Sequence, residues 1–110
     1  MTAPLRECHC VDLPKGTPPM ADAEIERQLA LVDGWRHVGG AIERSFDFPD
    51  FHRTMAFVNA VAWICHAENH HPDLAASYGR CTLRFNTHTV GGISQNDFIC
   101  AAKVDALVAR

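Results

Sequence analysis

The sequence predicts an α+β fold in which three helices pack on one face of a four-stranded antiparallel sheet (order α-β-β-α-β-β-α). Three segments repeat apolar residues at helical spacing, and four shorter segments pair off around glycine-containing turns. A long helix between two hairpins favours an antiparallel sheet whose helices share one face. The other face of the sheet is then expected to stay free of helices.

Length and composition restrict the class of protein. The chain has 110 residues, of which 47% are hydrophobic and 21% are charged, and its formal net charge is -3. One domain with a single core is expected over residues 21–110, after an irregular, proline-rich leader at residues 1–20. The weakly acidic balance lacks the basic surface of nucleic-acid-binding proteins.

Two further patterns bear on the cellular location of the protein: the length of its apolar runs and the positions of its cysteines. The leader contains no apolar run long enough for a signal peptide, and no later segment is apolar enough to span a membrane. We therefore expect a cytoplasmic protein that contacts neither membrane nor nucleic acid. Among the five cysteines, Cys65, Cys81 and Cys100 lie in apolar patterns typical of buried free thiols in a reducing compartment.

The first helix is predicted over residues 22–32, where apolar residues recur every three or four positions. Strands over residues 35–38 and 41–48 flank Gly39-Gly40, a connection typical of a two-residue hairpin. Arg44 interrupts the apolar face of the second strand, and the pattern gives no reason for it.

The longest helix is predicted to begin after Asp50, a residue type that caps helices, and to be stopped by Pro72. It is apolar over much of its surface, which predicts packing on the sheet and on a partner subunit. We therefore expect a homodimer or homotetramer formed through this helix. Its main apolar stripe comprises Phe51, Met55, Val58, Ala62 and Cys65, and Phe57, Val61 and Ile64 widen it.

A second hairpin and a final helix complete the pattern. Strands are expected over residues 74–78 and 80–88, and the second of them alternates apolar and polar residues over its whole length. The final helix is predicted to begin at the capping box formed by Ser94 and Asp97. Its inward residues are Phe98, Ala101, Val104 and Val108.

Four titratable residues are expected to meet at one edge of this sheet. His70 and His71 follow the long helix, His88 ends the fourth strand, and Asp97 lies in the first turn of the last helix. Each has a simpler alternative: Asp97 could act only as a helix cap, and an isolated histidine such as His66 is usually only solvated. The doublet of imidazoles at the end of an apolar helix is harder to explain by packing.

A metal site is the main chemical alternative, and the spacing argues against it. Cys8 and Cys10 are separated by one residue, whereas zinc knuckles use two to four. His66 and His70 are spaced as in zinc helices, but Glu68 lies at the wrong offset for an H-E-x-x-H motif. Histidines without a metal suit acid–base chemistry, because their pKa lies near neutral pH.

The pattern as a whole resembles the signature of the pterin-4a-carbinolamine dehydratases, over about residues 20 to 110. The stretches "GWRHVGGAIERSFDFPDFHRTMAFVNAVA" and "SYGRCTLRFNTHTVGGISQNDF" resemble the two hairpins of that family together with the helix that follows each. The signature itself reads His66-x-x-x-His70-His71-Pro72, followed by Tyr78, His88 and Asp97.

The resemblance implies a hydro-lyase of the same α+β fold that associates as dimers or tetramers. Members dehydrate 4a-hydroxytetrahydrobiopterin to quinonoid dihydrobiopterin, which recycles the cofactor of aromatic amino acid hydroxylases. The reaction uses no metal and no organic cofactor. Two alternatives stay open: a non-catalytic binding or assembly module with this fold, and a dehydratase for another pterin, such as a molybdopterin-related species. The complete set of histidines favours an enzyme over a module.

The resemblance also implies the roles of single residues. His70 and His88 correspond to the acid–base pair, His71 corresponds to the histidine that mainly holds the pterin, and all three count as catalytic. Relatives often carry glutamate where this chain has His66, and we expect Glu68 to compensate in part. The expected pterin-binding set comprises His71, Pro72, Tyr78, Thr87 and Asp97.

Overall fold

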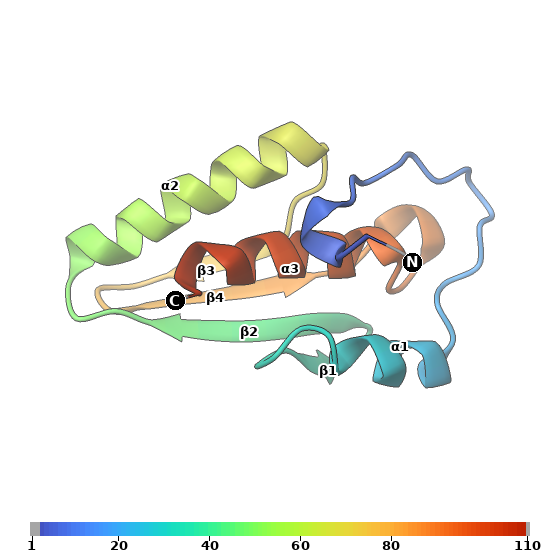
Figure 1. Ribbon diagram of the computed structural model, residues 1–110, viewed down its shortest axis with the longest axis horizontal. Coiled ribbons are helices and arrows are strands. Elements are labelled where there is room, and N and C mark those ends of the chain that lie inside the picture. The colour runs from blue at the N-terminus through green and yellow to red at the C-terminus, as the bar shows by residue number, and fades with distance from the viewer. Residues whose placement is uncertain (1–2, 110) are drawn as a thin grey trace.

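The computed structural model describes residues 3–109 and has the predicted α+β architecture (Figure 1). Its element order is α-β-β-α-β-β-α, which confirms the predicted fold class. Two short 3-10 helices, η1 and η2, are additional. The elements are η1 (Leu5–Glu7), α1 (Asp22–Leu29), β1 (Arg36–Val38), β2 (Ala41–Asp47), α2 (Phe51–Glu68), β3 (Asp73–Ala76), β4 (Arg80–Phe85), η2 (His88–Val90) and α3 (Gln95–Val108).

The four strands form one antiparallel sheet in the order β1-β2-β4-β3. The Gly39-Gly40 connection between β1 and β2 is confirmed, since Val38 pairs directly with Ala41. Both glycines have positive φ angles, 48° and 74°, and this conformation matches the twist of a tight two-residue hairpin. Glycine adopts it without the steric cost that a Cβ atom would bring.

One face of the sheet carries the core. In the β2–β4 register Ile42 lies opposite Phe85 and Phe46 lies opposite Cys81, and all four side chains are buried. In Figure 1, α2 and α3 lie on the same side of the sheet. Residues of all three helices belong to the same cluster as this face, among them Ile25, Phe57, Val61, Phe98 and Val104.

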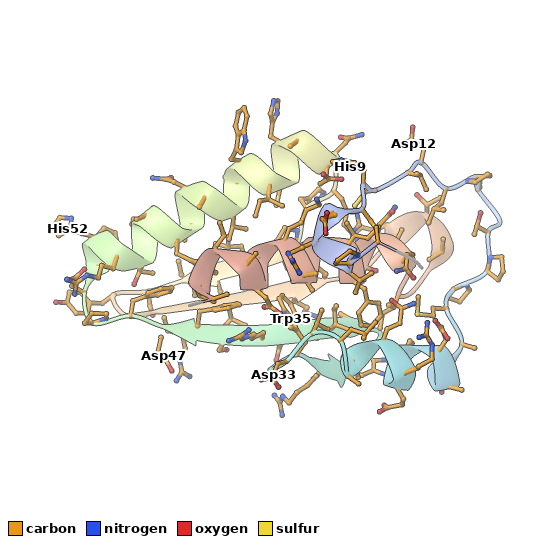
Figure 2. All side chains as sticks on the ribbon, viewed as in Figure 1. His9, Asp12, Asp33, Trp35, Asp47 and His52 are labelled. Atoms are coloured by element: carbon orange, nitrogen blue, oxygen red, sulfur yellow. The ribbon has the colours of Figure 1, made fainter. Side chains whose placement is uncertain are left out.

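The opposite face is polar, as predicted, and among residues 3–109 no helix contributes to it. Cross-strand partners there are complementary: Glu43 faces Arg84, and Asp47 faces Arg80 with 2.8 Å between Oδ1 and Nε. Figure 2 shows Asp47 pointing away from the helices. Such pairs satisfy a solvated face without competing for the core.

Arg44, which the apolar pattern could not explain, lies on the core face and is matched there. Its Nη1 donates to Asp105 Oδ1 of α3 at 2.8 Å and to the carbonyl of Asp33 at 3.0 Å. The guanidinium carbon lies 4.4 Å from the centre of the Phe46 ring, a cation–π contact. Asp105 Oδ1 also accepts from the Trp35 indole at 2.8 Å. The arginine is therefore the partner of a half-buried carboxylate between sheet and helix.

Three predicted segments extended two or three residues too far. The first helix ends at Leu29 instead of residue 32, and β3 ends at Ala76 because the Ser77 amide already donates to the Arg80 carbonyl across the turn. β4 ends at Phe85 instead of residue 88. Thr87 instead forms an isolated bridge with Gly92, which closes a loop that contains η2.

The long helix begins as predicted, because the Asp50 side chain accepts from the Arg53 amide at 2.8 Å. α2 ends at Glu68 with Asn69 as its C-cap, so the helix stops before Pro72, and His70 and His71 follow its end as predicted. Its buried face differs from the predicted main stripe: Phe51 is 48% exposed. The residues of α2 that are buried are Thr54, Phe57 and Val61.

The leader contacts the rest of the fold through η1, which packs against α3, and then runs around the molecule to α1 (Figure 1). Within residues 3–109, none of the helices combines the length and the apolar character needed to cross a membrane.

The Arg44–Asp105 pair gives a test of the core face. Replacing Asp105 with Ala leaves the arginine without its charged partner, and we expect a loss of about 2 kcal/mol in unfolding free energy. Asp47→Ala, which breaks the exposed Asp47–Arg80 pair, should cost less than about 1 kcal/mol. Urea denaturation measures both values. Equal losses would contradict the assignment of Asp105 to the core.

Candidate functional site

The end of α2 aims His70 back toward the sheet. Asn69 adopts a left-handed conformation with φ 52°, which asparagine tolerates better than most residues. The amide of His70 donates to the Cys65 carbonyl at 3.2 Å, and that of Asn69 donates to the His66 carbonyl at 3.4 Å. These are the two hydrogen bonds of a Schellman motif, so the reversal is part of the helix end itself.

His70 meets a buried carboxylate. Its Nε2 lies 2.6 Å from Oδ1 of Asp97, whose exposed fraction is 0%. The imidazole also stacks on the ring of Phe85, with the centres 5.9 Å apart and the planes 15° from parallel. Three elements, α2, β4 and α3, therefore define the position of this ring.

Asp97 is both a helix cap and a partner of the histidine, so the two interpretations of its role are compatible. Its Oδ2 accepts from the Ser94 amide at 2.9 Å, which completes the predicted capping box. The same oxygen accepts from the Thr87 hydroxyl at 2.9 Å, and Thr87 Oγ1 lies 2.7 Å from Ser94 Oγ. Since a hydroxyl has one proton, Ser94 donates to Thr87 and Thr87 donates to Asp97.

This network sets the protonation pattern of His70. An ionised carboxylate only accepts hydrogen bonds, so the Asp97 contact is donated by His70 Nε2–H. In the neutral ring the second nitrogen, Nδ1, then keeps its lone pair and can accept a proton. Asp97 also stabilises the positive charge that the ring acquires when it does so.

The other two predicted histidines are exposed and lie near this pair. His71 follows His70 directly, and its Nδ1 lies 3.4 Å from the carbonyl oxygen of the half-buried Pro72. His88 opens η2 and directly follows Thr87, which is bonded to Asp97. Neither histidine forms an ion pair with another residue in the described range 3–109. Their rings are thus available to a ligand.

Two residues of the predicted pterin-binding set lie elsewhere or are already engaged. Tyr78 is 68% exposed in the β3–β4 turn, and its carbonyl accepts from Thr54 in the first turn of α2. α2 has 18 residues and is about 27 Å long, so Tyr78 lies at the end of the helix far from His70. Thr87 is only 7% exposed, and its hydroxyl is bonded within the protein.

His66 and Glu68 also depart from expectation. The exposed His66 ring packs on Trp63, with 5.3 Å between ring centres. Glu68 does not compensate for it, because its side chain faces the leader and binds the Cys10 amide at 2.7 Å. Burial alone would raise the pKa of Glu68, but the donors from Cys10, His9 and Lys103 outweigh burial and lower it.

The cysteines do not assemble a metal centre. Within residues 3–109 no group of three or more histidine, cysteine or acidic side chains could hold a metal ion. Cys10 and Cys100 are free thiols whose sulfur atoms lie 3.6 Å apart. The hydrogen bond to Cys10 and burial raise the pKa of the Cys100 thiol, so it remains protonated near neutral pH.

Sequence reasoning missed Phe85, Ser94 and Asn69 as parts of the site. Ser94 was recognised as a cap, yet its link to a histidine depends on a loop closure that no local pattern encodes. Phe85 could have been suspected because it lies on the apolar side of its strand, at the end that leads to His88. Asn69, directly before the doublet, is a residue type that often ends helices, and this signal was available.

Comparison with known proteins identifies the family of this chain. The family model for pterin 4 alpha carbinolamine dehydratase matches residues 18–107. This chain belongs to that family. Its histidine doublet, His88 and Asp97 all lie within the matched region.

Relatives of known name agree with this assignment over most of their length. A Nitrosospira multiformis protein, named provisionally as such a dehydratase, is 50% identical over 90 residues, which cover 82% of this chain and 80% of the relative. A Xanthomonas campestris protein with the same provisional name is 49% identical and covers 94% of this chain and 90% of its own. A crystal structure from Brucella melitensis, described as a transcriptional coactivator/pterin dehydratase, superposes with a TM-score of 0.80 at 30% identity. It covers 83% of this chain and 99% of its own.

Thr87→Val tests whether the Thr87 hydroxyl stabilises the buried carboxylate of Asp97. The substitution keeps the shape and removes one donor to a buried carboxylate, so we expect a loss of about 2 kcal/mol in unfolding free energy. Thr87→Ser keeps the hydroxyl and serves as the matched control. Urea denaturation at neutral pH compares the two. If valine were tolerated as well as serine, the hydroxyl would not support Asp97.

Proposed function

We propose that this protein dehydrates 4a-hydroxytetrahydrobiopterin to quinonoid dihydrobiopterin and water, and so takes part in the recycling of tetrahydrobiopterin. The observation that carries the proposal is the His70–Asp97 pair, 2.6 Å apart, beside two exposed histidines in a chain of the dehydratase family. A buried carboxylate that orients an imidazole is the arrangement expected of a proton-transfer residue.

Loss of the 4a-hydroxyl requires two proton movements. Hydroxide is a poor leaving group, so an acid must protonate it while the C4a–O bond breaks. A ring N–H proton must leave as the quinonoid double bonds form. Two imidazoles near the ring can share these tasks, each worth about 10²–10⁴-fold in rate.

The surroundings of the two histidines suggest which task each performs. His70 Nδ1 suits the base, because Asp97 at Nε2 stabilises the imidazolium that results. His88, exposed and without an ion-pair partner among residues 3–109, suits the acid that protonates the leaving hydroxyl. The exposed His71, placed by Pro72, would hold the pterin between them.

Histidine variants test this assignment. His70→Ala and His88→Ala should each lower kcat by about 10²-fold or more, because each removes a positioned proton-transfer group. His71→Ala should mainly raise KM. His52→Ala is the control, since His52 lies at the other end of α2 (Figure 2). The 4a-hydroxypterin is generated in situ, and the quinonoid product is followed by absorbance.

Three results would argue against the assignment. No acceleration by the wild-type protein would refute the dehydratase function for this substrate. Full activity of both His70→Ala and His88→Ala would refute their roles. Faster turnover of a molybdopterin-related substrate in the same assay would replace the substrate and keep the chemistry.

We further propose that the protein forms homodimers or homotetramers through α2. Two aromatic side chains of this helix are exposed, Trp63 by 69% and Phe51 by 48%, and exposed apolar surface is a feature of association sites. All four residues of the edge strand β3 are exposed as well. Open sheet edges and large exposed apolar side chains are both typical of surfaces that a second copy covers.

Trp63→Glu tests this surface. A buried glutamate at an interface costs association free energy, so we expect the apparent mass to fall toward the monomer value of 12.2 kDa. Multi-angle light scattering on a sizing column measures the mass of both proteins. A wild-type protein that already elutes as a monomer at micromolar concentration would contradict the proposal.

A further inference from the structure

The leader, for which sequence reasoning found no role, is bonded to the end of α2. The Cys10 amide donates to Glu68 Oε1 at 2.7 Å, and His9 Nδ1 lies 2.9 Å from Glu68 Oε2. Figure 2 shows His9 beside this end of the helix. The Glu68 side chain is only 5% exposed, and Lys103 of α3 lies 3.6 Å from it. Glu68 precedes His70 by two positions.

The next leader residue is bonded to the start of α3. The Val11 amide donates to Asn96 Oδ1 at 3.0 Å, and Asn96 Nδ2 donates to the Val11 carbonyl at 2.8 Å. This two-way amide contact resembles one step of a β-ladder and leaves Asn96 only 7% exposed. The Cys10 thiol points the same way, 3.5 Å from the Asn96 carbonyl and 3.6 Å from Cys100 Sγ. Asn96 directly precedes Asp97.

We propose that residues 9–11 are a positioning clamp for the His70–Asp97 pair. The clamp joins the residue two positions before the histidine to the residue directly before the carboxylate. It therefore resists separation of the C-terminal end of α2 from the N-terminal end of α3, the movement that would lengthen the 2.6 Å contact. Proton transfer is sensitive to such shifts, because an error of about 1 Å in position can cost 10²-fold in rate.

Glu68 acts in this clamp in its ionised form. Burial is opposed by the Cys10 amide, His9 and Lys103, and together these donors lower the pKa of Glu68. Because the folded-state pKa is depressed, the contribution is complete above the ordinary glutamate pKa and disappears as the pH falls through the lowered value. The clamp is thus closed at neutral pH.

A simpler role for the leader is to stabilise the fold, and the two roles differ in what they change. Asn96→Ala removes both amide hydrogen bonds to Val11 and leaves Asp97 in place. Gln95→Ala is the matched control, because it removes a side-chain amide from the same helical turn that contacts Gln28 instead of the leader. If the leader only stabilised the fold, Asn96→Ala would lower Tm and leave the His70–Asp97 contact as intact as it is in Gln95→Ala.

The direct readout is the proton between the two side chains. In the full-length wild-type protein, NMR should show a slowly exchanging, downfield Nε2–H resonance of His70. We expect this resonance to broaden or disappear in Asn96→Ala and in Glu68→Ala, and to persist in Gln95→Ala. The double variant Glu68→Ala/Asn96→Ala should resemble each of its two single variants, because release of either end frees the same leader segment.

Turnover is the second readout and rests on the dehydratase function proposed above. We expect kcat of Asn96→Ala to fall on the order of tenfold with KM nearly unchanged, because positioning and not binding is lost. An unchanged His70 resonance in both Asn96→Ala and Glu68→Ala, with folded spectra, would overturn the clamp. A lost resonance in a protein without dehydratase activity would support the clamp and refute the function.

Discussion

The buried carboxylate of Asp97 is the interaction on which the rest of this region depends. It receives His70 from beyond α2, Thr87 from beyond β4 and the Ser94 amide at the start of its own helix. An unpaired charge in a site with no exposure would cost several kcal/mol, so all three donors must be present in the folded state. Because the folded state needs the donor from His70 at Asp97, the same contact that stabilises the fold also orients this ring.

The two faces of the sheet meet different requirements, solvation of charged side chains on one face and packing of apolar side chains on the other. Its polar face satisfies cross-strand charges in solvent, whereas its other face joins the three helices in one core. Arg44 is the exception on the core face, and Asp105 and the Phe46 ring match it there. The core is thus complete without the rings of His71 and His88, which stay exposed.

Residues that are close in a sequence signature need not be close in space. His71 and Tyr78 are seven positions apart, yet β3 lies between them and the chain runs back beside α2, so that the Tyr78 carbonyl accepts from Thr54 in the first turn of that helix. In contrast, Glu68 and Cys10 are 58 positions apart and share a hydrogen bond. Distance along the chain is therefore a poor guide to which residues lie beside His70.

Local chemistry in the sequence determined the element types, the Gly39-Gly40 hairpin, both helix caps and the identity of the titratable residues, because these depend on neighbours within four positions. Tertiary structure decided the rest. The reversal at Asn69 placed His70 against α3. The bridge of Thr87 with Gly92 turned an expected strand end into a support for Asp97, and the leader folded onto Glu68 and Asn96, which lie close to that pair in the chain. The contacts of His70 with Asp97 and of the leader with Glu68 and Asn96 join segments far apart in the chain, and no periodicity or spacing encodes which buried donor will meet which acceptor.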